Sequence, residues 1–582
     1  MYFIPSPLEL SEVKVFLFLR ESFEMVLNGS QIILECLIEQ GVDTVFGYPG
    51  GAVLNIYDAL YDYSDRITHI LTSHEQAASH AADGYSRTTG KTGVVIATSG
   101  PGATNLVTGL ATAYMDSIPM VAITGNVATS LLGLDSFQEV DITGITMPIT
   151  KHNYIVKDVT KLADVIREAF FIANDGRKGP VLIDIPKDIT AAKCEYEPKI
   201  PATHSYTVDI DEIKAAAELI SKAEKPFIYA GGGVVSCDAV NELAELAELI
   251  DAPVSLSLMG QCAFDNSNER YTGMLGMHGT KASSLALTEC DLMIVLGSRF
   301  SDRVTCNSET FRQAAEKANI LHIDIDPAEI NKNITADYKV CGNIKLVLEK
   351  LNKLIEKKNH SEWMNKVMDW KNTYPLCQVS DDADDVLPQE VLETLDEITN
   401  GEAIVSTEVG QHQMWTAEFY NFRNPRSFAS SGGLGTMGYG LGAAIGCKVG
   451  NPDKVVVNCA GDGSFYMNMN ELTTLAKYQL PVIELVFNNS VLGMVRQWQK
   501  LFYNNHFSQT TLEKPTDFEM LAKAIGIESL TIKNKSDIRP VLEKAITLNK
   551  PVLINCIIDK DINVLPMVPA GASIAEPILE IK

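Results

Sequence analysis

Short apolar runs alternate with helix-length segments through most of this chain, and this alternation is the feature that most restricts its fold. Between residues 42 and 190 the apolar runs are DTVFG, THILT, GVVIATSG, PMVAITG and PVLIDIP. Short apolar runs separated by segments long enough for a helix are typical of βα units that build a parallel sheet. We therefore predict an α/β fold of the doubly wound type.

The same pattern occurs in three consecutive series, which predicts three α/β domains. The first covers residues 25–190, the second 205–355 and the third 386–560. A length of 582 residues agrees with about three domains of 100–200 residues each. Residues 1–24 are predicted to be an extension outside the fold, and residues 561–582 a C-terminal tail.

The first and third series also resemble each other. The segments ATAYMDSIPMVAITGN and LTTLAKYQLPVIELVFNN each read as a helix, an X-Pro step, an apolar strand and an asparagine. This echo suggests a duplicated unit. Between the second and third series, the acid-rich QVSDDADDVLP (residues 378–388) is predicted to be a hydrated linker.

Composition limits the kinds of partner. The formal net charge of −26 disfavours a sequence-independent grip on nucleic acid or on an anionic membrane, so we expect small metabolites as ligands. No stretch reaches 18 uninterrupted apolar residues, so we expect no membrane span. The 11 cysteines are scattered and form no C-x-x-C pair, which favours a reducing, cytoplasmic location without disulfides or structural zinc.

Polar residues follow two apolar runs of the third series. KVVVNCAGDGSF, a helical segment and LPVIELVFNN predict a βαβ unit, so Asp462 and Asn489 fall at the carboxyl ends of neighbouring parallel strands. Their oxygens, the carbonyl of Val491 and the amides beside Gly461 and Gly463 suit a Mg²⁺ ion that carries a diphosphate. Either motif alone is more typical of a turn. Together, 27 positions apart, they predict a metal-diphosphate site.

The motif GDGS followed by NN resembles the cofactor anchor of thiamine diphosphate enzymes. Further segments extend the similarity from about Met25 to the final PMVPAGASIAEP, among them VFGYPGGAVLNIYDAL, HEQAASHAADGYSRTTGK, TSGPGATNLVTGLATAYMDSIPM, DSFQEVDITGIT, GSRFSDRVT, GQHQMW and SSGGLGTMGYGLGAAIG. Together they resemble the catalytic subunits of the acetohydroxyacid synthases, also called biosynthetic acetolactate synthases. The resemblance implies three domains of the pyruvate oxidase and decarboxylase type, which bind the aminopyrimidine, FAD and the diphosphate with Mg²⁺.

The resemblance also implies a reaction. Pyruvate is decarboxylated on thiamine diphosphate, and the hydroxyethyl carbanion is added to pyruvate or 2-oxobutanoate. The products, 2-acetolactate and 2-aceto-2-hydroxybutanoate, lead to valine, leucine and isoleucine. A homodimer or a dimer of dimers is implied, with Glu75 and Asp462 of one site on different chains, together with a small regulatory subunit. Alternatives on the same fold are a pyruvate oxidase-like flavin oxidoreductase, a catabolic acetolactate synthase and a non-catalytic binding protein.

Further residues acquire roles through the resemblance. Glu75 is implied to donate a hydrogen bond to the aminopyrimidine ring, although an isolated glutamate there is more typical of a helix start. The adjacent His74 and the nearby His80 are as often packed as catalytic. The other implied residues of this site are Gly51, whose amide faces the reacting centre, Gln138 at the entrance, Met437 as an apolar wedge between the cofactor rings, and Gly461, Gly463 and Ser464 at the diphosphate.

Flavin and substrate contacts are implied in the same way. The FAD residues are Arg177, Gly231, Gly232, Met277, His278, Gly297, Arg299, Arg303 and Asp324. Arginines suit a diphosphate through forked hydrogen bonds, but they suit plain ion pairs as well. Trp498 and Lys151 are implied to contact the substrate, with Trp498 favouring an acceptor that carries an extra methyl group.

Four positions depart from the family pattern. They are Asn126, Ser301, Asn343 and Gly442, where the family has Gln, an acid, Asp and Pro. These departures bear on the affinity for flavin and on the rigidity of loops rather than on the type of reaction.

Overall fold

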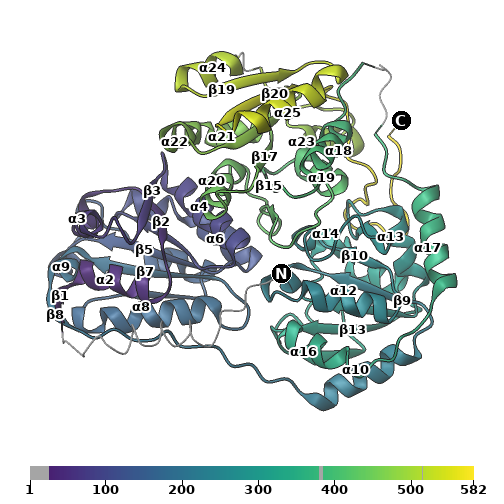
Figure 1. Ribbon diagram of the computed structural model, residues 1–582, viewed down its shortest axis with the longest axis horizontal. Helices are drawn as coiled ribbons and strands as arrows, with labels where there is room; N and C mark the ends of the chain where they lie inside the picture. The colour runs from purple at the N-terminus through teal and green to yellow at the C-terminus, as the bar shows by residue number, and fades with distance from the viewer. Residues whose placement is uncertain (1–24, 379–383, 514–515, 582) are drawn as a thin grey trace.

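The computed structural model describes residues 25–378, 384–513 and 516–581. The predicted extension at 1–24 and part of the predicted linker, at 379–383, lie outside the described residues. The described chain forms three six-stranded sheets and one two-stranded ribbon (Figure 1). Neighbouring strands within each six-stranded sheet run parallel, and helices flank the sheets, which confirms the predicted doubly wound α/β fold.

The first sheet is built from residues 44–186. In spatial order its strands are β3 (Thr68–Leu71), β2 (Thr44–Gly47), β4 (Gly93–Ala97), β5 (Met120–Asn126), β7 (Pro180–Pro186) and β6 (His152–Ile155). The antiparallel ribbon joins β1 (Met25–Asn28) to β8 (Lys193–Tyr196). The helices of this first domain are α2 (Gly29–Glu39), α3 (Leu54–Asp62), α4 (Glu75–Thr89), α5 (Pro101–Thr104), α6 (Val107–Asp116), α7 (Ile142–Thr146), α8 (Val159–Asn174) and α9 (Lys187–Ala191).

The middle sheet is built from residues 226–341. In spatial order its strands are β11 (Tyr271–Met274), β10 (Val254–Leu256), β9 (Pro226–Ala230), β12 (Leu292–Leu296), β13 (Asn319–Asp324) and β14 (Tyr338–Cys341). Its helices are α10 (Ile210–Lys222), α11 (Gly232–Ser236), α12 (Val240–Leu249), α13 (Lys281–Glu289), α14 (Asp302–Thr305), α15 (Ser308–Ala314), α16 (Ile344–Leu351) and α17 (Ser361–Thr373).

The third sheet is built from residues 404–557. In spatial order its strands are β16 (Phe428–Ala429), β15 (Ile404–Thr407), β17 (Val456–Gly461), β18 (Val482–Asn488), β20 (Val552–Ile557) and β19 (Glu528–Ile532). Its helices are α18 (Pro388–Thr399), α19 (Gln411–Phe419), α20 (Gly440–Gly450), α21 (Asp462–Asn468), α22 (Leu472–Tyr478), α23 (Gly493–Phe502), α24 (Phe518–Ile525) and α25 (Ile538–Leu548), and the 3₁₀ turn η5 (Met469–Glu471) links α21 to α22.

Strand order shows how the three sheets are related. Counted within each domain, the first and third sheets share the order 2-1-3-4-6-5, which agrees with the duplication suggested by the sequence echo. The middle sheet has the order 3-2-1-4-5-6, the arrangement of dinucleotide-binding sheets. Ligands of open α/β sheets bind beyond the carboxyl ends of the strands where this order reverses. These points lie at β2/β4, β9/β12 and β15/β17.

One hydrophobic core joins the first and third domains. It contains Ala78, Ala82 and Phe46 from the first domain together with Ala444 and Ile445 from the third, all with exposed fractions below 5%. Helices α4 and α20 lie side by side at the centre of this core (Figure 1). The first and third domains are therefore packed as one unit, whereas the middle sheet has its own cores on its two faces.

The C-terminal segment connects the third domain to the middle domain. The amide of Val564 donates to Oε1 of Gln497 in α23 at 2.9 Å, and the amide of Val568 donates to the carbonyl of Met277 at 2.7 Å. Ile574 is fully buried in the core of the middle domain. In the described part of the chain, no helix has both the length and the apolar character to cross a bilayer.

Candidate active site

The predicted metal ligands lie beyond the carboxyl ends of two neighbouring strands in the third sheet. The strand register pairs Gly461 of β17 with Phe487 of β18, so Asp462 and Asn489 both follow directly beyond the ends of these neighbouring strands. This placement confirms the predicted position at neighbouring parallel strand ends. Asp462 is 3% exposed and is the first residue of α21, and the Asn489 Oδ1 accepts from the amide of Val491 at 3.2 Å.

The donors at this edge suit a hard cation. Asp462 offers a carboxylate, Asn489 an amide oxygen and Val491 a backbone carbonyl, the oxygen ligands that Mg²⁺ takes beside phosphate oxygens. Among the described residues, no group of three or more His, Cys, Asp or Glu side chains gathers as a metal site, so a Zn-type cluster has no counterpart here. Ser464 is buried, and its hydroxyl donates to the Gly461 carbonyl at 3.1 Å.

Two buried side chains at this site escaped the sequence analysis. The ring of His412 in α19 packs against Gly461, where an added Cβ would lie 2.8 Å from Nδ1, and its buried Nε2 lacks a hydrogen-bond partner. Burial lowers the pKa of His412 to about 3, so the ring is neutral. The carboxylate of Glu408 accepts from the amides of Gly438 at 2.6 Å and Gly440 at 2.8 Å, beside Met437. Both residues follow β15, and their position after an apolar run was the available signal.

Glu75 lies beyond the carboxyl end of a strand of the first sheet, four residues after the last residue of β3. It begins α4, as predicted, and its Oε2 accepts from the Asn105 amide at 3.0 Å. A Cβ on Gly102 would lie 3.2 Å from Oε1, so this glycine keeps space beside the carboxyl. Gln138, with a φ of 60°, packs its backbone against Gly100, two residues before Gly102. Gly51 lies in the loop after β2, and an added Cβ there would meet no atom of this chain within 4 Å.

The two histidines near Glu75 have structural contacts. His74 is the N-cap of α4, where its ring accepts from the amide of Gln76 at 3.1 Å. His80 is fully buried, with its ring centroid 5.2 Å from that of Tyr439, and burial lowers its pKa to about 3. These contacts favour the packed alternative for both residues.

A cavity of about 2270 Å³ opens between the three domains. Its volume is more than twice that of an ordinary small-molecule site, so it has room for a dinucleotide. The predicted flavin residues all line it: Arg177, Gly231, Gly232, Met277, His278, Gly297, Arg299, Arg303 and Asp324. Trp498 lines it from α23, with its ring 5.6 Å from Phe502.

The floor of the cavity is the point where the strand order of the middle sheet reverses. The loops after β9 and β12 abut there, and a Cβ on Gly231 would lie 2.4 Å from the Gly297 carbonyl. Gly297 has a φ of +55°, which glycine adopts without strain. The amides of Gly231 and Gly297 donate to the carbonyls of Leu296 and Ile323, both at 2.9 Å, so these glycines contribute the close approach of the two loops at the position where dinucleotide folds hold a diphosphate.

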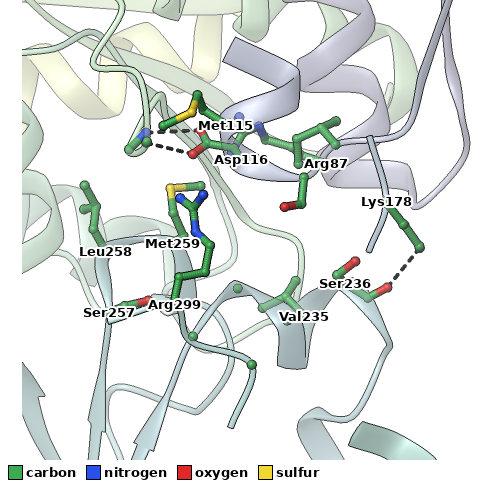
Figure 2. A pocket seen from close by; sticks show the side chains of 18 of the residues that line it. Arg87, Met115, Asp116, Lys178, Val235, Ser236, Ser257, Leu258, Met259 and Arg299 are labelled. Atoms are coloured by element: carbon green, nitrogen blue, oxygen red, sulfur yellow. Dashed lines mark hydrogen bonds and ion pairs between the residues drawn. The ribbon is translucent and has the colours of Figure 1, made fainter. Parts of the chain in front are cut away.

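The charged residues of the cavity differ in their partners and in their exposure. Arg177 binds Glu329 at 2.7 Å, the ion-pair alternative considered for it. Arg299 projects from the β12 loop toward Asp116 (Figure 2), and burial followed by repulsion from Arg177 lowers its pKa. Arg303 has a 61% exposed side chain. Burial raises the pKa of Asp324 to about 6.

The roof of the cavity contains a buried ionic cluster that the sequence analysis did not identify. Arg87 of α4 donates to Asp83 at 2.5 Å and to Asp116 at 2.9 Å. Asp116 also accepts from the amides of Gly432 at 3.2 Å and Gly433 at 2.7 Å (Figure 2). The cluster thus fixes the start of the loop that leads to the predicted wedge Met437.

Lys151 does not line the cavity. Its ammonium donates to the carbonyls of Ile172 and Asp175 at the end of α8, so it caps that helix. Burial lowers its pKa. The predicted contact with substrate stays a prediction.

The four positions that depart from the family pattern have the following surroundings. Asn126 donates to the buried Asp184, and Asn343 is the N-cap of α16, accepting from the amide of Leu346 at 3.2 Å. A Cβ on Gly442 in the first turn of α20 would lie 2.9 Å from Cβ of His80 in α4. Ser301 precedes α14 and lines the cavity.

The comparisons with known proteins agree with this geometry. Three family descriptions match in order: "Thiamine pyrophosphate enzyme, N-terminal TPP binding domain" at residues 27–145, the central domain of the same enzymes at 213–351, and their "C-terminal TPP binding domain" at 408–556. Each match falls on one of the three sheets.

Proteins similar to the chain over nearly its whole length include acetolactate synthases from distant organisms. The "Probable acetolactate synthase large subunit" of Methanocaldococcus jannaschii is 45% identical, covering 95% of this chain and 96% of that protein. The "Acetolactate synthase large subunit" of Porphyra purpurea is 44% identical, covering 95% of each. The "Acetolactate synthase" of Mycobacterium bovis is 46% identical, covering 94% of this chain and 90% of that protein. The chain belongs to the thiamine pyrophosphate enzymes and, among them, to the family of acetolactate synthase large subunits.

Proposed function

We propose that this chain is the catalytic subunit of an acetolactate synthase. It joins pyruvate to a second pyruvate or to 2-oxobutanoate with loss of CO₂, and the products serve the synthesis of branched-chain amino acids. The observation that carries the proposal is that Glu75 follows a strand of the first sheet while Asp462 and Asn489 follow strands of the third sheet, which has the same strand order, in a chain 44–46% identical to proteins that bear this name.

The residues present suit thiamine diphosphate with Mg²⁺. Asp462, Asn489 and the carbonyl of Val491 would hold the ion, and the backbone at Gly461 and Gly463 with the Ser464 hydroxyl would lie beside the diphosphate. The unpaired Nε2 of His412 supports a polar ligand at this edge. When bound, the cofactor supplies the stabilised carbanion that amino-acid side chains do not provide. Glu75 would donate a hydrogen bond to the aminopyrimidine, and Met437 would lie between the two cofactor rings.

FAD occupies the central cavity in this proposal. The dinucleotide strand order, the glycines at β9/β12 and the volume of about 2270 Å³ support a dinucleotide. Arg299 faces its diphosphate, because a guanidinium forms forked hydrogen bonds with such groups. Trp498 contacts the second 2-oxo acid at the end of the cavity formed by α23.

The active unit is a homodimer in which Glu75 of one chain and Asp462 of the other form one site. Exposed apolar side chains near the two sheet edges support contact with a second copy, among them Phe137 with an exposed fraction of 88%, Leu54 with 53% and Met467 with 58%. A small regulatory subunit accompanies the dimer, because the relatives carry the name "large subunit".

Product analysis tests this function. The purified chain is incubated with pyruvate, thiamine diphosphate and Mg²⁺, and acetolactate is measured as acetoin after acid treatment. Pyruvate and 2-oxobutanoate are then supplied together, and the flavin spectrum is recorded. Glu75→Gln should abolish the product while the chain still binds the cofactor. Flavin bleaching by pyruvate under anaerobic conditions, with an electron acceptor consumed stoichiometrically, would instead indicate an oxidoreductase.

A further inference from the structure

The segment that delivers Glu75 is held by the third domain of the same chain. Residues 72–74 connect β3 to α4, and Glu75 follows as the first residue of that helix. The Leu71 amide donates to the Tyr478 hydroxyl at 2.8 Å. The Ser73 amide donates to both carboxylate oxygens of Glu471, at 3.0 and 3.1 Å. Both contacts join positions about four hundred residues apart, so they depend on the packing of the two domains.

Glu471 is itself fixed from several sides. It is fully buried in η5, and it also accepts from the Thr474 hydroxyl at 2.6 Å and from the Asn470 amide at 3.0 Å. Burial raises its pKa. A buried carboxylate is costly unless hydrogen bonds satisfy it, and a backbone amide of another domain is among its partners here. The Ser73 hydroxyl is 2.6 Å from that of Thr473, which adds a second link at the same point.

The position of Glu75 is therefore restricted both at its side chain and at the backbone that precedes it. Asn105 holds its carboxyl group, and Glu471 holds the backbone two residues before it. A group that forms a catalytic hydrogen bond must be placed within about 0.5 Å, because a misplacement of about 1 Å costs up to roughly a hundredfold in rate. The Glu471 carboxylate accepts hydrogen bonds from the Ser73 amide, which lies just before the first turn of α4. It therefore restricts the position of that turn.

We propose that Glu471 is a positioning residue for Glu75, which sets the orientation in which the Glu75 carboxyl meets the aminopyrimidine ring. This inference rests on the proposed function, in which Glu75 activates thiamine diphosphate. Glu471 lies nine residues after Asp462 in the continuous segment α21–η5. One stretch of the third domain thus carries the predicted metal ligand and steadies the predicted activating acid.

The test measures activation of the cofactor separately from its binding. The full-length protein is loaded with thiamine diphosphate and Mg²⁺ and transferred to D₂O, and exchange of the C2 proton of the cofactor is followed by acid quench and NMR. Glu471→Ala should slow this exchange roughly ten- to a hundredfold, with the cofactor dissociation constant changed less than about threefold. Glu471→Gln and Tyr478→Phe, each of which keeps most of the local volume, should slow exchange to a smaller degree.

A matched control separates positioning from general stability. Asp396→Ala removes another buried carboxylate of the third domain, whose partners Asn421 and Arg423 belong to that domain. This variant should lose stability while its exchange rate stays within about twofold of the wild-type rate. An equal slowing in Asp396→Ala and Glu471→Ala would overturn the proposal in favour of a purely structural role.

Glu75→Gln gives the reference for lost activation. If Glu75→Gln exchanges at the wild-type rate, the role of Glu75 in the proposed function is wrong. If Glu75→Gln is slow while Glu471→Gln and Tyr478→Phe both match the wild type, only the positioning role of Glu471 is wrong. Should Glu471→Ala fail to fold, these two milder variants decide the question by the same measurement.

Discussion

At the scale of single residues, the buried charges of the first domain bind the loops of the third. Arg87 and Asp116 have side chains exposed by 4% and 0%, and their cluster holds Gly432 and Gly433 at the start of the loop that contains Met437. Tyr439, at the end of this loop, donates to Asp83 at 2.6 Å. The cluster, whose side chains come from α4 and α6, therefore fixes both ends of the loop between Gly432 and Tyr439.

Removing the cation of this cluster should be strongly destabilising. Arg87→Met leaves the carboxylates of Asp83 and Asp116 buried without their cationic partner, and breaking a buried pair in this way costs about 3–5 kcal/mol. Urea unfolding followed by circular dichroism should show a lower midpoint, and the affinity for thiamine diphosphate should fall as the loop loosens.

An exposed ion pair provides the control for Arg87→Met. Lys91 binds Asp43 at 2.6 Å with side chains exposed by 51% and 55%, so Lys91→Met should cost less than about 1 kcal/mol. Equal midpoints for the two variants would contradict the importance assigned to burial.

Asp184 should give the stability of the first domain a measurable pH dependence. Burial raises the pKa of Asp184 to about 7, above its ordinary value of 3.8. The folded chain then binds this proton more tightly than the unfolded chain, so the contribution is complete below pH 3.8 and is lost as the pH rises from there through about 7. Between pH 5 and pH 8 the wild type should lose about 3 kcal/mol more than Asp184→Asn. Urea midpoints across this range measure the difference, and parallel curves would contradict the shift.

Some residues of the candidate site could be predicted from the sequence, whereas others could not, for a physical reason. Asp462 and Asn489 follow apolar runs directly, so their place at neighbouring strand ends could be predicted from local pattern. Glu408, His412 and Glu471 have roles that depend on which segments pack against them, and no local pattern contains that information. For the same reason, the sequence could not show that Lys151 caps the end of helix α8.

At the scale of elements, helices α4 and α20 pack closely against each other and connect the first domain to the third. A Cβ on Gly84 would lie 2.2 Å from the carbonyl oxygen of Ala443, and one on Gly446 would lie 1.8 Å from that of Ala81. Small residues at these positions let the two helix backbones touch. Sequence pattern predicted that both helices exist, but it did not predict that they meet, because their contact is set by the arrangement of two sheets.

Gly446→Ala should disrupt this joint. The added methyl group meets a backbone oxygen that cannot rotate away, so the helices must separate, with an expected loss of about 3 kcal/mol or more. Differential scanning calorimetry should show a lower melting temperature. Gly179→Ala is the control, because its Cβ would meet only the flexible side chain of Lys151 at 3.0 Å. A larger loss in Gly179→Ala than in Gly446→Ala would contradict this account.

At the scale of the whole molecule, the number and class of the domains could be predicted from the sequence, whereas their arrangement could not. The alternation of apolar runs predicted parallel sheets, and the echo between two series suggested their common strand order. The cavity is formed by segments from all three domains, and its walls depend on contacts such as that between Arg177 and Glu329.

Co-expression of two inactive chains tests the shared active site. In the proposed homodimer, a mixed dimer of Glu75→Gln and Asp462→Ala carries both defects in one site and none in the other. With random assembly, roughly a quarter of the wild-type activity should return, because half of the dimers are mixed. Each variant alone should be inactive. No recovery in a mixture shown to contain mixed dimers would place both residues in a site within one chain.

The joint between α4 and α20 also has an evolutionary consequence. Where two side chains crowd each other, a change on one side can be balanced by a change on the other, and the pair drifts together through a lineage. At Gly84 and Gly446 the neighbour is a main-chain oxygen, which every amino acid possesses. No second mutation can make room there, so both positions should resist replacement across descendants of this chain while the apolar residues around them exchange freely.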